Sequence, residues 1–416
     1  MPALREDLDF MPSPLVDRPG IFIRDPYRYS EASLIVPPAL IEGLRCFDGR
    51  GSLATLAQHL SRRLGNVSET ERANAMRVAI QMRDALSEAG FLKNERFRKL
   101  RDDSHQRFRE APSRSAAHAG AGYPDSPPSL RATLAEWLEP AETSTTSPAD
   151  APRVDDLVAI AAPHASPSAS PETYAAAYGA LDQRHASRTF VILGTSHHGA
   201  PNRFGLTRKS FDTPLGRART NAAWVDELAR AAPSGFDMDD YCHAIEHSIE
   251  FQVLFLQGRF GPDISIVPIL CGPISEPRAL SPVVDALGTL HTRHAREGLW
   301  VLGVDMAHVG RRYGDGAVVQ ADDTTMDVVA TRDADRIHAL ESGDAPSFWQ
   351  TVHGGVGGQT PETYGRDDDL KWCGSAPFYT FLKAVPDTRG QLLRYHQWNI
   401  DDASVVTFGA MRFDAR

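Results

Sequence analysis

The sequence predicts an α/β fold for the larger, C-terminal part of this chain, preceded by a small helical module. From residue 155 onward, short apolar segments alternate with longer amphipathic ones, a pattern typical of a largely parallel sheet with crossover helices. Near residue 100 the composition shifts to a charged run and then to an Ala-, Ser- and Pro-rich stretch. A length of 416 residues leaves room for both parts.

The first module is expected over residues 1–100. Ile21–Ile23 form a short extended run, and Leu53, Leu56, Leu60 and Leu64 recur at helical spacing. A second helix is expected to begin with the capping-box pattern Ser68–Glu71 and to end at Gly90. Two amphipathic helices flanked by short extended pieces resemble a winged-helix or PqqD-like module. Their mixed charge, without a basic stripe, favours contact with a protein over DNA binding.

Residues 101–152 are predicted to be a linker, because the charged run at 99–110 is followed by a Ser- and Pro-rich composition. One helix is expected within it, over residues 130–138. The remaining residues, 153–416, are assigned to the α/β domain. Its strands are expected over residues 157–162, 190–193, 264–270, 299–304 and 405–410, and its helices over 171–184, 221–231, 244–258, 279–295 and 375–384.

The overall charge excludes some classes of partner. A formal net charge of -10 argues against a general nucleic-acid or membrane-surface role. No run of about 18 apolar residues predicts a membrane span. The N-terminal residues lack the cationic start and apolar core of a secretory signal. Because the four cysteines have no paired spacing, we expect free thiols and a cytoplasmic location.

Polar side chains follow three of the predicted strands. His164 follows the first, His197 and His198 follow the second, and Asp305 and His308 follow the fourth. Ligands of open α/β sheets bind beyond the carboxyl ends of the strands. If these strands are parallel, their ends share one edge of the sheet and these side chains converge. A single histidine of this kind is usually structural, but three such loops predict a functional site.

The segment YCHAIEHSIE, residues 241–250, is the densest polar cluster. His243, Glu246, His247 and Glu250 are spaced so that one helix would place them on one face. The order His-x-x-Glu-His also matches a zinc-protease pattern. That alternative needs a further carboxylate ligand downstream, and the candidates Glu276 and Glu297 have no supporting motif. A solvated helix face is the second alternative.

Cys373 lies in the segment KWCGSAP, just before an apolar helix. A lone cysteine beside a tryptophan is usually a buried apolar side chain. Next to a helix N-terminus its thiolate would be stabilised, which makes it a candidate metal ligand or nucleophile. Cys46, Cys242 and Cys271 have no comparable setting.

Together these motifs resemble the Memo family, also called AmmeMemoRadiSam system protein B. The matching segments, in order, are HAGAGYPDSPPSL (118–130), APHA (162–165), VILGTSHHG (191–199), DTPLG (212–216), HAIEHSIEFQVLFLQ (243–257), IVPILCG (266–272), VDMAH (304–308) and CGSAP (373–377). The resemblance covers roughly residues 115–416, and the series of motifs is highly specific.

The resemblance implies a fold like the class III extradiol dioxygenases: a central, mostly parallel mixed sheet with helices on both faces. Memo proteins are similar to those enzymes, with a cysteine in place of a metal-binding carboxylate. The ligands implied here are His164, His197 and Cys373. Asp305 and His308 are expected to line the same pocket, with His308 as an acid or base. The residues implied around and orienting the ligands are His198, His243, Glu246 and His247.

Two imidazoles and a thiolate suit one transition metal ion, iron or copper first and zinc third. After His164 the family continues with glycine and aromatic residues, whereas this chain has Ser166–Ala169. The substrate of the family therefore does not transfer to this chain. Two classes of function remain. One is a metal-dependent enzyme of redox or oxygen chemistry that acts on a small molecule or a protein. The other is a non-catalytic metal- or partner-binding protein.

Overall fold

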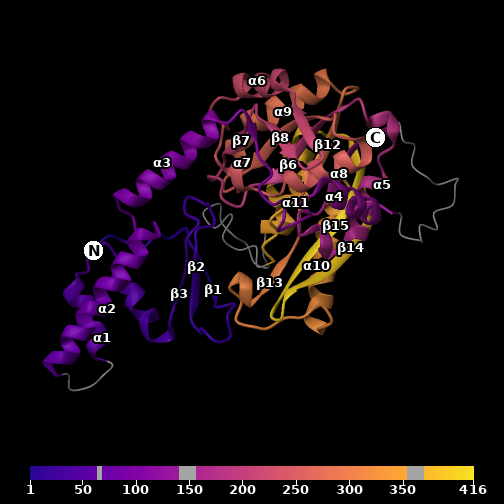
Figure 1. The fold of residues 1–416 in the computed structure, drawn as a ribbon. Helices are drawn as coiled ribbons and strands as arrows, with labels where there is room; N and C mark the ends of the chain where they lie inside the picture. Colours follow the sequence, from indigo (N-terminus) through magenta and orange to yellow (C-terminus); the bar gives the residue numbers. More distant parts are fainter. Residues whose placement is uncertain (63–67, 140–155, 354–369) are drawn as a thin grey trace. The chain divides into compact units, whose positions relative to one another are not determined.

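The computed structural model describes residues 1–62, 68–139, 156–353 and 370–416. These residues form two compact units, Met1–Ala111 and Pro112–Arg416, and each is described by itself (Figure 1). Within the described residues, no helix is long and apolar enough to cross a membrane.

The N-terminal unit combines a small antiparallel sheet with helices. Its strands, in the order β1–β2–β3, are Asp9–Pro12, Ile21–Arg24 and Ser33–Val36. A 3-10 helix (Pro38–Cys46), α1 (Leu53–Arg62), α2 (Glu69–Glu88) and α3 (Glu95–Glu110) follow. The predicted capping box starts α2, because the side chains of Ser68 and Glu71 each bond the other residue's backbone. Leu64, expected to continue the first helix, lies outside the described residues.

Residues 101–110, expected to begin a linker, instead form the second part of helix α3. Its first turn is capped by Asn94, whose side chain accepts a hydrogen bond from the backbone N–H of Phe97 at 3.0 Å. Phe97, Leu100, Ser104 and Phe108 recur every three or four residues among the charges, and the last two are buried. An apolar stripe hidden in a charged run thus forms a helix that belongs to the N-terminal unit.

Helix α4 (Pro127–Trp137) occupies the place of the helix expected within the linker. Leu130 and Leu134 are buried in the core of the C-terminal unit, and the Trp137 ring stacks on Phe255 at a centroid distance of 6.1 Å. Residues 112–139 are therefore part of that unit. The rest of the expected linker, from residue 140 to 152, lies outside the described residues.

The C-terminal unit is built on one large mixed sheet. Its main path runs β13–β15–β5–β12–β6–β11–β9–β8–β4, and β5, β12, β6 and β11 are mutually parallel. The strands are β4 (Ser113–Arg114), β5 (Leu157–Ala162), β6 (Thr189–Thr195), β7 (Phe204–Leu206), β8 (Ser210–Thr213), β9 (Gly216–Thr220), β10 (Phe236–Met238), β11 (Ser265–Cys271), β12 (Gly298–Gly303), β13 (His308–Gly310), β14 (Thr388–Asp401) and β15 (Ser404–Ala415). All five predicted strands are confirmed, whereas β14, which pairs antiparallel with β15, was not expected.

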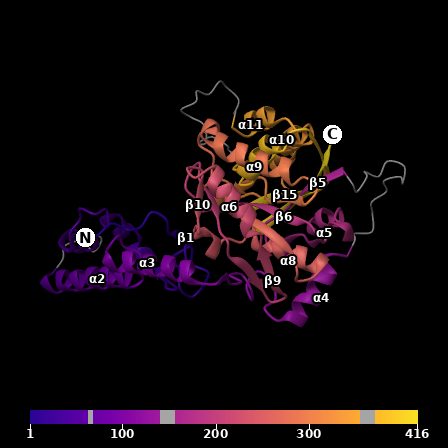
Figure 2. The ribbon, with the colours of Figure 1, turned by 90° about the horizontal axis from the view of Figure 1, so that it is seen from above.

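Helices cover both faces of this sheet (Figures 1 and 2). Successive residues of a strand point to opposite faces. Ala159 and Ala161 of β5 accordingly belong to one buried cluster, and Ile160 and Ala162 to the other. One cluster includes α6 (Ala222–Ala231), α9 (Ser281–Arg293), α10 (Thr324–Glu341), α11 (Ala345–His353) and α12 (Ser375–Ala384). The other includes α4, α5 (Pro171–Gly179) and α8 (Glu250–Phe260).

The single helix expected over residues 244–258 is wrong. Helix α7 (Cys242–Ile245) ends before Glu246, whose backbone is extended, and α8 begins only at Glu250. The link between them lies against the strand ends, where a Cβ on Gly194 would come within 2.6 Å of Ser248 and Ile249. The Ser248 hydroxyl also donates to the carbonyl of Thr195 at 2.7 Å. Docking onto the sheet edge therefore replaces a helical turn.

Candidate metal centre

The three predicted ligands are brought together at the carboxyl edge of the parallel strands. His164 follows β5, His197 follows β6 and Cys373 precedes α12. The candidate ligand atoms of these three residues all lie within 4.8 Å of one another. A shared ion with bonds of about 2.0–2.3 Å requires a separation of this order.

One ring nitrogen of His164 faces the other candidate ligands, and the second lies at hydrogen-bond distance from the backbone. Its Nδ1 lies 2.9 Å from the carbonyl oxygen of Gly303, at the end of the neighbouring strand β12. Its Nε2 lies 3.3 Å from the Cys373 sulfur. The side chain is buried. A ring that donates Nδ1–H to a carbonyl keeps the Nε2 lone pair for a metal.

His197 is held in the same manner by a side chain. Its Nδ1 lies 3.0 Å from Oε1 of Glu246, and its backbone N–H donates to Oε2 at 2.9 Å. Its ring meets that of His164 edge-on, with centroids 5.0 Å apart. About a third (32%) of its side chain is exposed, so the group is open to solvent on this side.

The electrostatics of the group favour the thiolate. Burial by itself would raise the pKa of the Cys373 thiol, but the charges of His164 and His308 and hydrogen bonds from His164 and His197 lower it to about 5. Burial opposes the charged form of His164, while the charges of Asp305 and Cys373 raise its pKa to about 9. The thiolate is the form of cysteine that binds metals.

Asp305 and His308 lie close to the candidate ligands. The Asp305 carboxylate accepts the backbone N–H of His164 at 2.9 Å, and its second oxygen lies 3.5 Å from His164 Nε2. The carbonyl of Asp305 accepts the N–H of Gly374 at 3.0 Å, which ties the cysteine turn to the same residue. The Nδ1 of His308 bonds the carbonyl of Met306 at 3.0 Å, and its ring packs edge-on against Tyr313.

His247 and Glu246 form a second layer over the ligands. The Nδ1 of His247 lies 3.0 Å from the Glu246 oxygen that also binds His197. The His247 ring is nearly parallel to that of His197, with centroids 5.1 Å apart, and edge-on to that of His164 at 5.3 Å. His197, Glu246 and His247 are also close enough to one another to hold an ion. A carboxylate at hydrogen-bond distance from both rings instead fits an orienting role.

Two other predicted residues do not join the ligands. The His243 ring is buried, faces Phe211 edge-on, and neither ring nitrogen has a hydrogen-bond partner among the described residues. His243 and His198 belong to neither group of candidate ligands in the described chain. Because the helix breaks after Ile245, His243 and His247 do not share one helix face. The zinc-protease arrangement is therefore not formed.

Glu250, expected on the same helix face, instead anchors the segment that opens the unit. Its carboxylate is buried and pairs with the Arg114 guanidinium and the Tyr123 hydroxyl. It also accepts the backbone N–H groups of Ala117 and His118, at 3.1 and 3.0 Å.

This anchoring brings His118, which the sequence reasoning did not select, next to the second layer. Its ring lies 5.5 Å from that of His247, and its Nε2 lies 2.8 Å from the carbonyl oxygen of Ile245. Its place in the opening motif HAGAGYPDS was the available signal.

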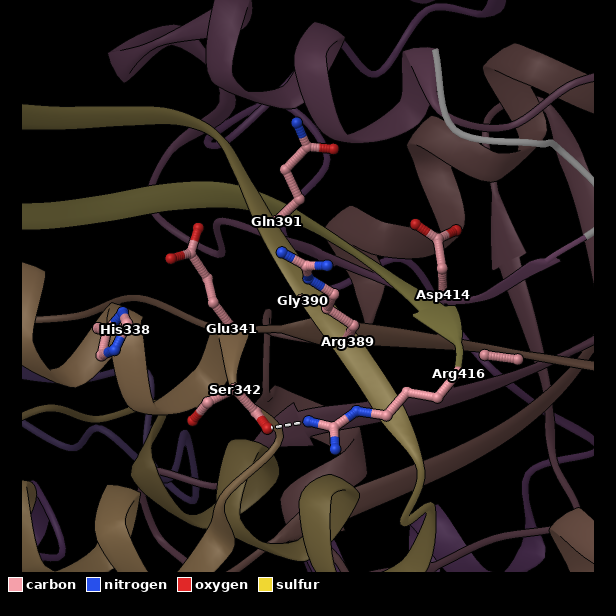
Figure 3. A pocket seen from close by; sticks show the side chains of 9 residues that line it. His338, Glu341, Ser342, Arg389, Gly390, Gln391, Asp414 and Arg416 are labelled. Carbon is pink, nitrogen blue, oxygen red and sulfur yellow. Dashed lines mark hydrogen bonds between the residues drawn. The ribbon is translucent and has the colours of Figure 1, made fainter. Parts of the chain in front are cut away.

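A surface hollow elsewhere on this unit is lined by His338, Glu341, Ser342, Arg389, Gly390, Gln391, Asp414, Ala415 and Arg416 (Figure 3). It lies at the amino-terminal end of strand β5, because Asp414 pairs with Leu157, the first residue of that strand. His164 instead follows the carboxyl-terminal end of β5. The Arg416 guanidinium donates to the Ser342 carbonyl, and no charged lining side chain is buried. The hollow is thus separate from the candidate metal centre.

Comparison with known proteins shows the family of this chain. A family profile described as "Memo-like protein" matches residues 114–412. A MEMO1 family protein of Aquifex aeolicus is 26% identical over 293 residues, which cover 70% of this chain and 73% of that protein. A MEMO1 family protein of Thermus thermophilus is 29% identical over 261 residues, covering 62% and 73%. One of Pyrococcus furiosus is 32% identical over 208 residues, covering 48% and 67%. The matched profile contains every residue of the candidate centre.

Proposed function

The chain belongs to the Memo family, and from this premise we propose that it is a metalloprotein in which His164, His197 and Cys373 hold one transition metal ion. The observation that carries the proposal is the state of the two imidazoles. Each has its Nδ1 at hydrogen-bond distance from an oxygen, and each belongs to the group that converges on the Cys373 sulfur. Imidazole ligands of metals are supported in this way in proteins generally.

The donor set supports iron or copper first and zinc third, since two imidazoles and a thiolate suit borderline to soft ions. Three protein ligands leave coordination positions for a substrate. When bound, such an ion would supply Lewis acidity and, for iron or copper, electron transfer. The sheet with helices on both faces supports the further proposal that the fold is that of the class III extradiol dioxygenases.

Around the ligands, Asp305 would fix the position of the His164 loop relative to the turn that contains Cys373. Glu246 would orient the ring of His197. His308, whose charge is felt by the Cys373 thiol, would transfer a proton to or from the substrate. Exposure of the His197 side favours a metal-dependent oxidoreductase acting on a small molecule or a protein. The alternative, a non-catalytic metal- or partner-binding protein that retains the fold, needs no proton-transfer group.

The test is the metal content of the full chain after anaerobic reconstitution with iron(II), copper(I) or zinc. Cys373→Ala is expected to lose most of the metal, because two histidines alone rarely hold a mononuclear ion. Cys242→Ala and Cys271→Ala are matched controls, since both thiols are buried but belong to neither group of candidate ligands, and should leave the content unchanged. Equal metal in wild type and Cys373→Ala would overturn the assignment.

A second variant separates enzyme from binding protein. His308→Ala should retain the metal, because His308 is not one of the converging ligands, and should lose oxygen consumption by the iron- or copper-loaded protein. If wild type and His308→Ala consume oxygen at the same rate, the result favours the non-catalytic alternative.

For the N-terminal unit we propose a winged-helix or PqqD-like module that contacts a protein partner, in a cytoplasmic protein whose four cysteines are free. The support is a cluster of exposed apolar side chains in and after β1: Phe10, Leu15 and Val16, which are 44%, 43% and 100% exposed. Cross-linking of the full chain to a candidate partner should weaken in Phe10→Ser/Val16→Ser, with metal content unchanged. Binding of duplex DNA by the full chain would contradict the proposal.

A further inference from the structure

A second buried polar cluster lies behind the metal centre. Asp333 of α10 is fully buried, and its carboxylate accepts three hydrogen bonds. Oδ1 accepts the indole N–H of Trp372 at 2.6 Å, while Oδ2 accepts the hydroxyls of Tyr395 at 2.8 Å and Thr407 at 2.6 Å. A buried carboxylate costs free energy unless such donors satisfy it, so this network is a specific feature of the fold.

Trp372 directly precedes the candidate ligand Cys373, and its side chain is held from two directions. Asp333 fixes the indole nitrogen, and the buried guanidinium of Arg336 lies 5.3 Å from the centre of the ring. The ring also packs against Phe348 and Phe378, with centroids 6.0 and 6.2 Å away. Trp372 therefore has little freedom to rotate or shift.

The backbone on either side of Cys373 is equally restricted. Lys371 has a φ of 51°, in the left-handed region, and its ammonium pairs with Asp315 at 2.7 Å. After the cysteine, Gly374 lies so close to Asp305 that a Cβ would meet its carbonyl oxygen at 2.6 Å. The carbonyl of Cys373 accepts the Thr195 hydroxyl at 3.2 Å. Because the backbone of this turn has little freedom, a shift of Trp372 would also shift the side chain of Cys373.

We propose that Asp333 is a positioning residue of the metal centre: by holding the Trp372 indole, it fixes the direction from which Cys373 presents its sulfur to the ion. The inference rests on the proposed metal function. Ligands must be held to within about half an ångström for tight binding, and groups that orient ligands typically contribute about 10–100-fold to metal affinity. Asp333 is not a ligand, and it reaches the cysteine turn through Trp372. Its bond to Thr407 leads instead to the backbone of Ala307.

The donors to the two carboxylate oxygens of Asp333 can be removed one at a time, which gives a matched pair of variants. Trp372→Phe removes the one hydrogen bond to Oδ1 and keeps an aromatic ring next to Cys373. Tyr395→Phe removes one hydrogen bond to Oδ2, on strand β14, without touching the cysteine turn. Both remove a donor from the same buried carboxylate, so a merely structural role of Asp333 would make them similar.

The probe is cobalt(II), bound to the full chain, whose sulfur-to-metal charge-transfer absorption reports the Cys373 bond. Cobalt affinity is measured by competition with a chelator. In Trp372→Phe we expect binding weaker by about 10–100-fold and a shifted or weakened sulfur band. In Tyr395→Phe both should stay close to wild type. Equal effects in the two variants, or an unchanged sulfur band in Trp372→Phe, would overturn the inference.

Substitutions of Asp333 itself supply a rescue. Asp333→Asn keeps an amide oxygen that can accept the Trp372 N–H, and should restore a wild-type sulfur band. Asp333→Leu removes the acceptor and should reproduce Trp372→Phe; if it fails to fold, the Trp372→Phe and Tyr395→Phe pair decides. A wild-type protein that binds cobalt without a sulfur band would refute the metal assignment itself, and with it this inference. A normal wild-type band with no difference among the variants refutes the positioning role alone.

Discussion

The buried Arg5 cluster of the N-terminal unit and the histidine group of the C-terminal unit use polar side chains in opposite ways. All five N–H groups of the Arg5 guanidinium have acceptors: Asp7, Asp25 and the carbonyl of Gly90. Asp25 in turn accepts two backbone N–H groups, those of Tyr27 and Ser30. The guanidinium is thus fully satisfied within the cluster, and it has no N–H group left for a ligand.

The histidine group uses its polar atoms differently. His164 and His197 each use Nδ1 for an oxygen of the chain, and each contributes to a group of converging ligand atoms at the sheet edge. On that side the two rings meet only the Cys373 sulfur and, for His164, an oxygen of Asp305. Atoms that are all good metal donors and that converge at an open edge are suited to hold an ion between them, whereas the donors of the Arg5 guanidinium are all used inside the fold.

The largest effect expected from this contrast is on the stability of the N-terminal unit. Asp25→Ala leaves the buried Arg5 charge with Asp7 as its one carboxylate partner among those described, and breaking a buried ion pair costs about 3–5 kcal/mol. All six tryptophans lie at residue 137 or beyond. Hydrogen exchange of residues 1–111 should therefore accelerate, while the tryptophan-detected unfolding of the C-terminal unit and the metal content stay unchanged.

A matched control lies in the same sheet. Asp9 and Arg24 form an exposed pair at 2.9 Å, with side chains 36% and 52% accessible. Exposed pairs contribute about 0–1 kcal/mol, so Asp9→Ala should barely change the exchange rates. Equal effects of Asp9→Ala and Asp25→Ala would show that the Arg5 cluster does not carry the stability assigned to it.

The next effect concerns the support of the metal ligands. Glu246→Ala leaves His197 without its Nδ1 partner, and we expect cobalt(II) affinity to fall by about 10–100-fold. The control is Glu297→Ala. The Glu297 side chain is 72% exposed, and it is one of the two candidate carboxylate ligands of the zinc-protease alternative. Titration of both variants with cobalt tests the contrast directly. A loss of affinity in Glu297→Ala and none in Glu246→Ala would reverse the assignment.

The candidate ligands could be named from the sequence because each stands next to a local signal and the resemblance to the Memo family selected these three together. His164 and His197 follow apolar strands, and Cys373 precedes an apolar helix. Glu246 was selected for a helical spacing that the structure does not have. Its role comes from a bond to His197, a residue 49 positions away. The residue was identified, but its geometry depended on tertiary contacts.

The Asp333 network had no local signal. Its partners Trp372, Tyr395 and Thr407 are 39, 62 and 74 positions away, and three of the four side chains lie in elements that were not predicted or in a loop. Strand β14 has few consecutive buried residues, so no apolar run marks it. Pairing between distant residues is decided by the packed sheet rather than by spacing along the chain.

A smaller effect is expected in the reactivity of Cys373 in metal-free protein. With a pKa lowered to about 5, the thiol is ionised at pH 6, and alkylation should slow only as the pH falls through about 5. His164→Ala removes a positive charge and a hydrogen bond that lower this pKa, so its rate at pH 6 should drop. We estimate about tenfold, because a larger thiolate fraction is partly offset by the weaker nucleophilicity of low-pKa thiolates.

Mass spectrometry of iodoacetamide-treated protein across pH 4–8 checks this prediction. Cys242 and Cys271 are internal controls, because burial raises the pKa of both thiols. They should remain unmodified over this range. A Cys373 rate that rises only near pH 8 would contradict the thiolate.

The smallest effect is expected at His243, which the sequence placed beside the ligands. Its ring is buried, and burial lowers its pKa although the charge of Asp240 and the backbone of Gly205 oppose this. Neither ring nitrogen makes a hydrogen bond of ordinary geometry to a described residue. It resembles neither the closed Arg5 cluster nor the converging ligands.

Replacing an unsatisfied polar group by an apolar one of similar size is nearly neutral or stabilising. His243→Leu should therefore change the free energy of unfolding by no more than about 1 kcal/mol and leave cobalt binding intact, measured by tryptophan-detected denaturation and by cobalt titration. Loss of the metal in His243→Leu would restore the zinc-protease alternative, since that arrangement requires this imidazole as a ligand.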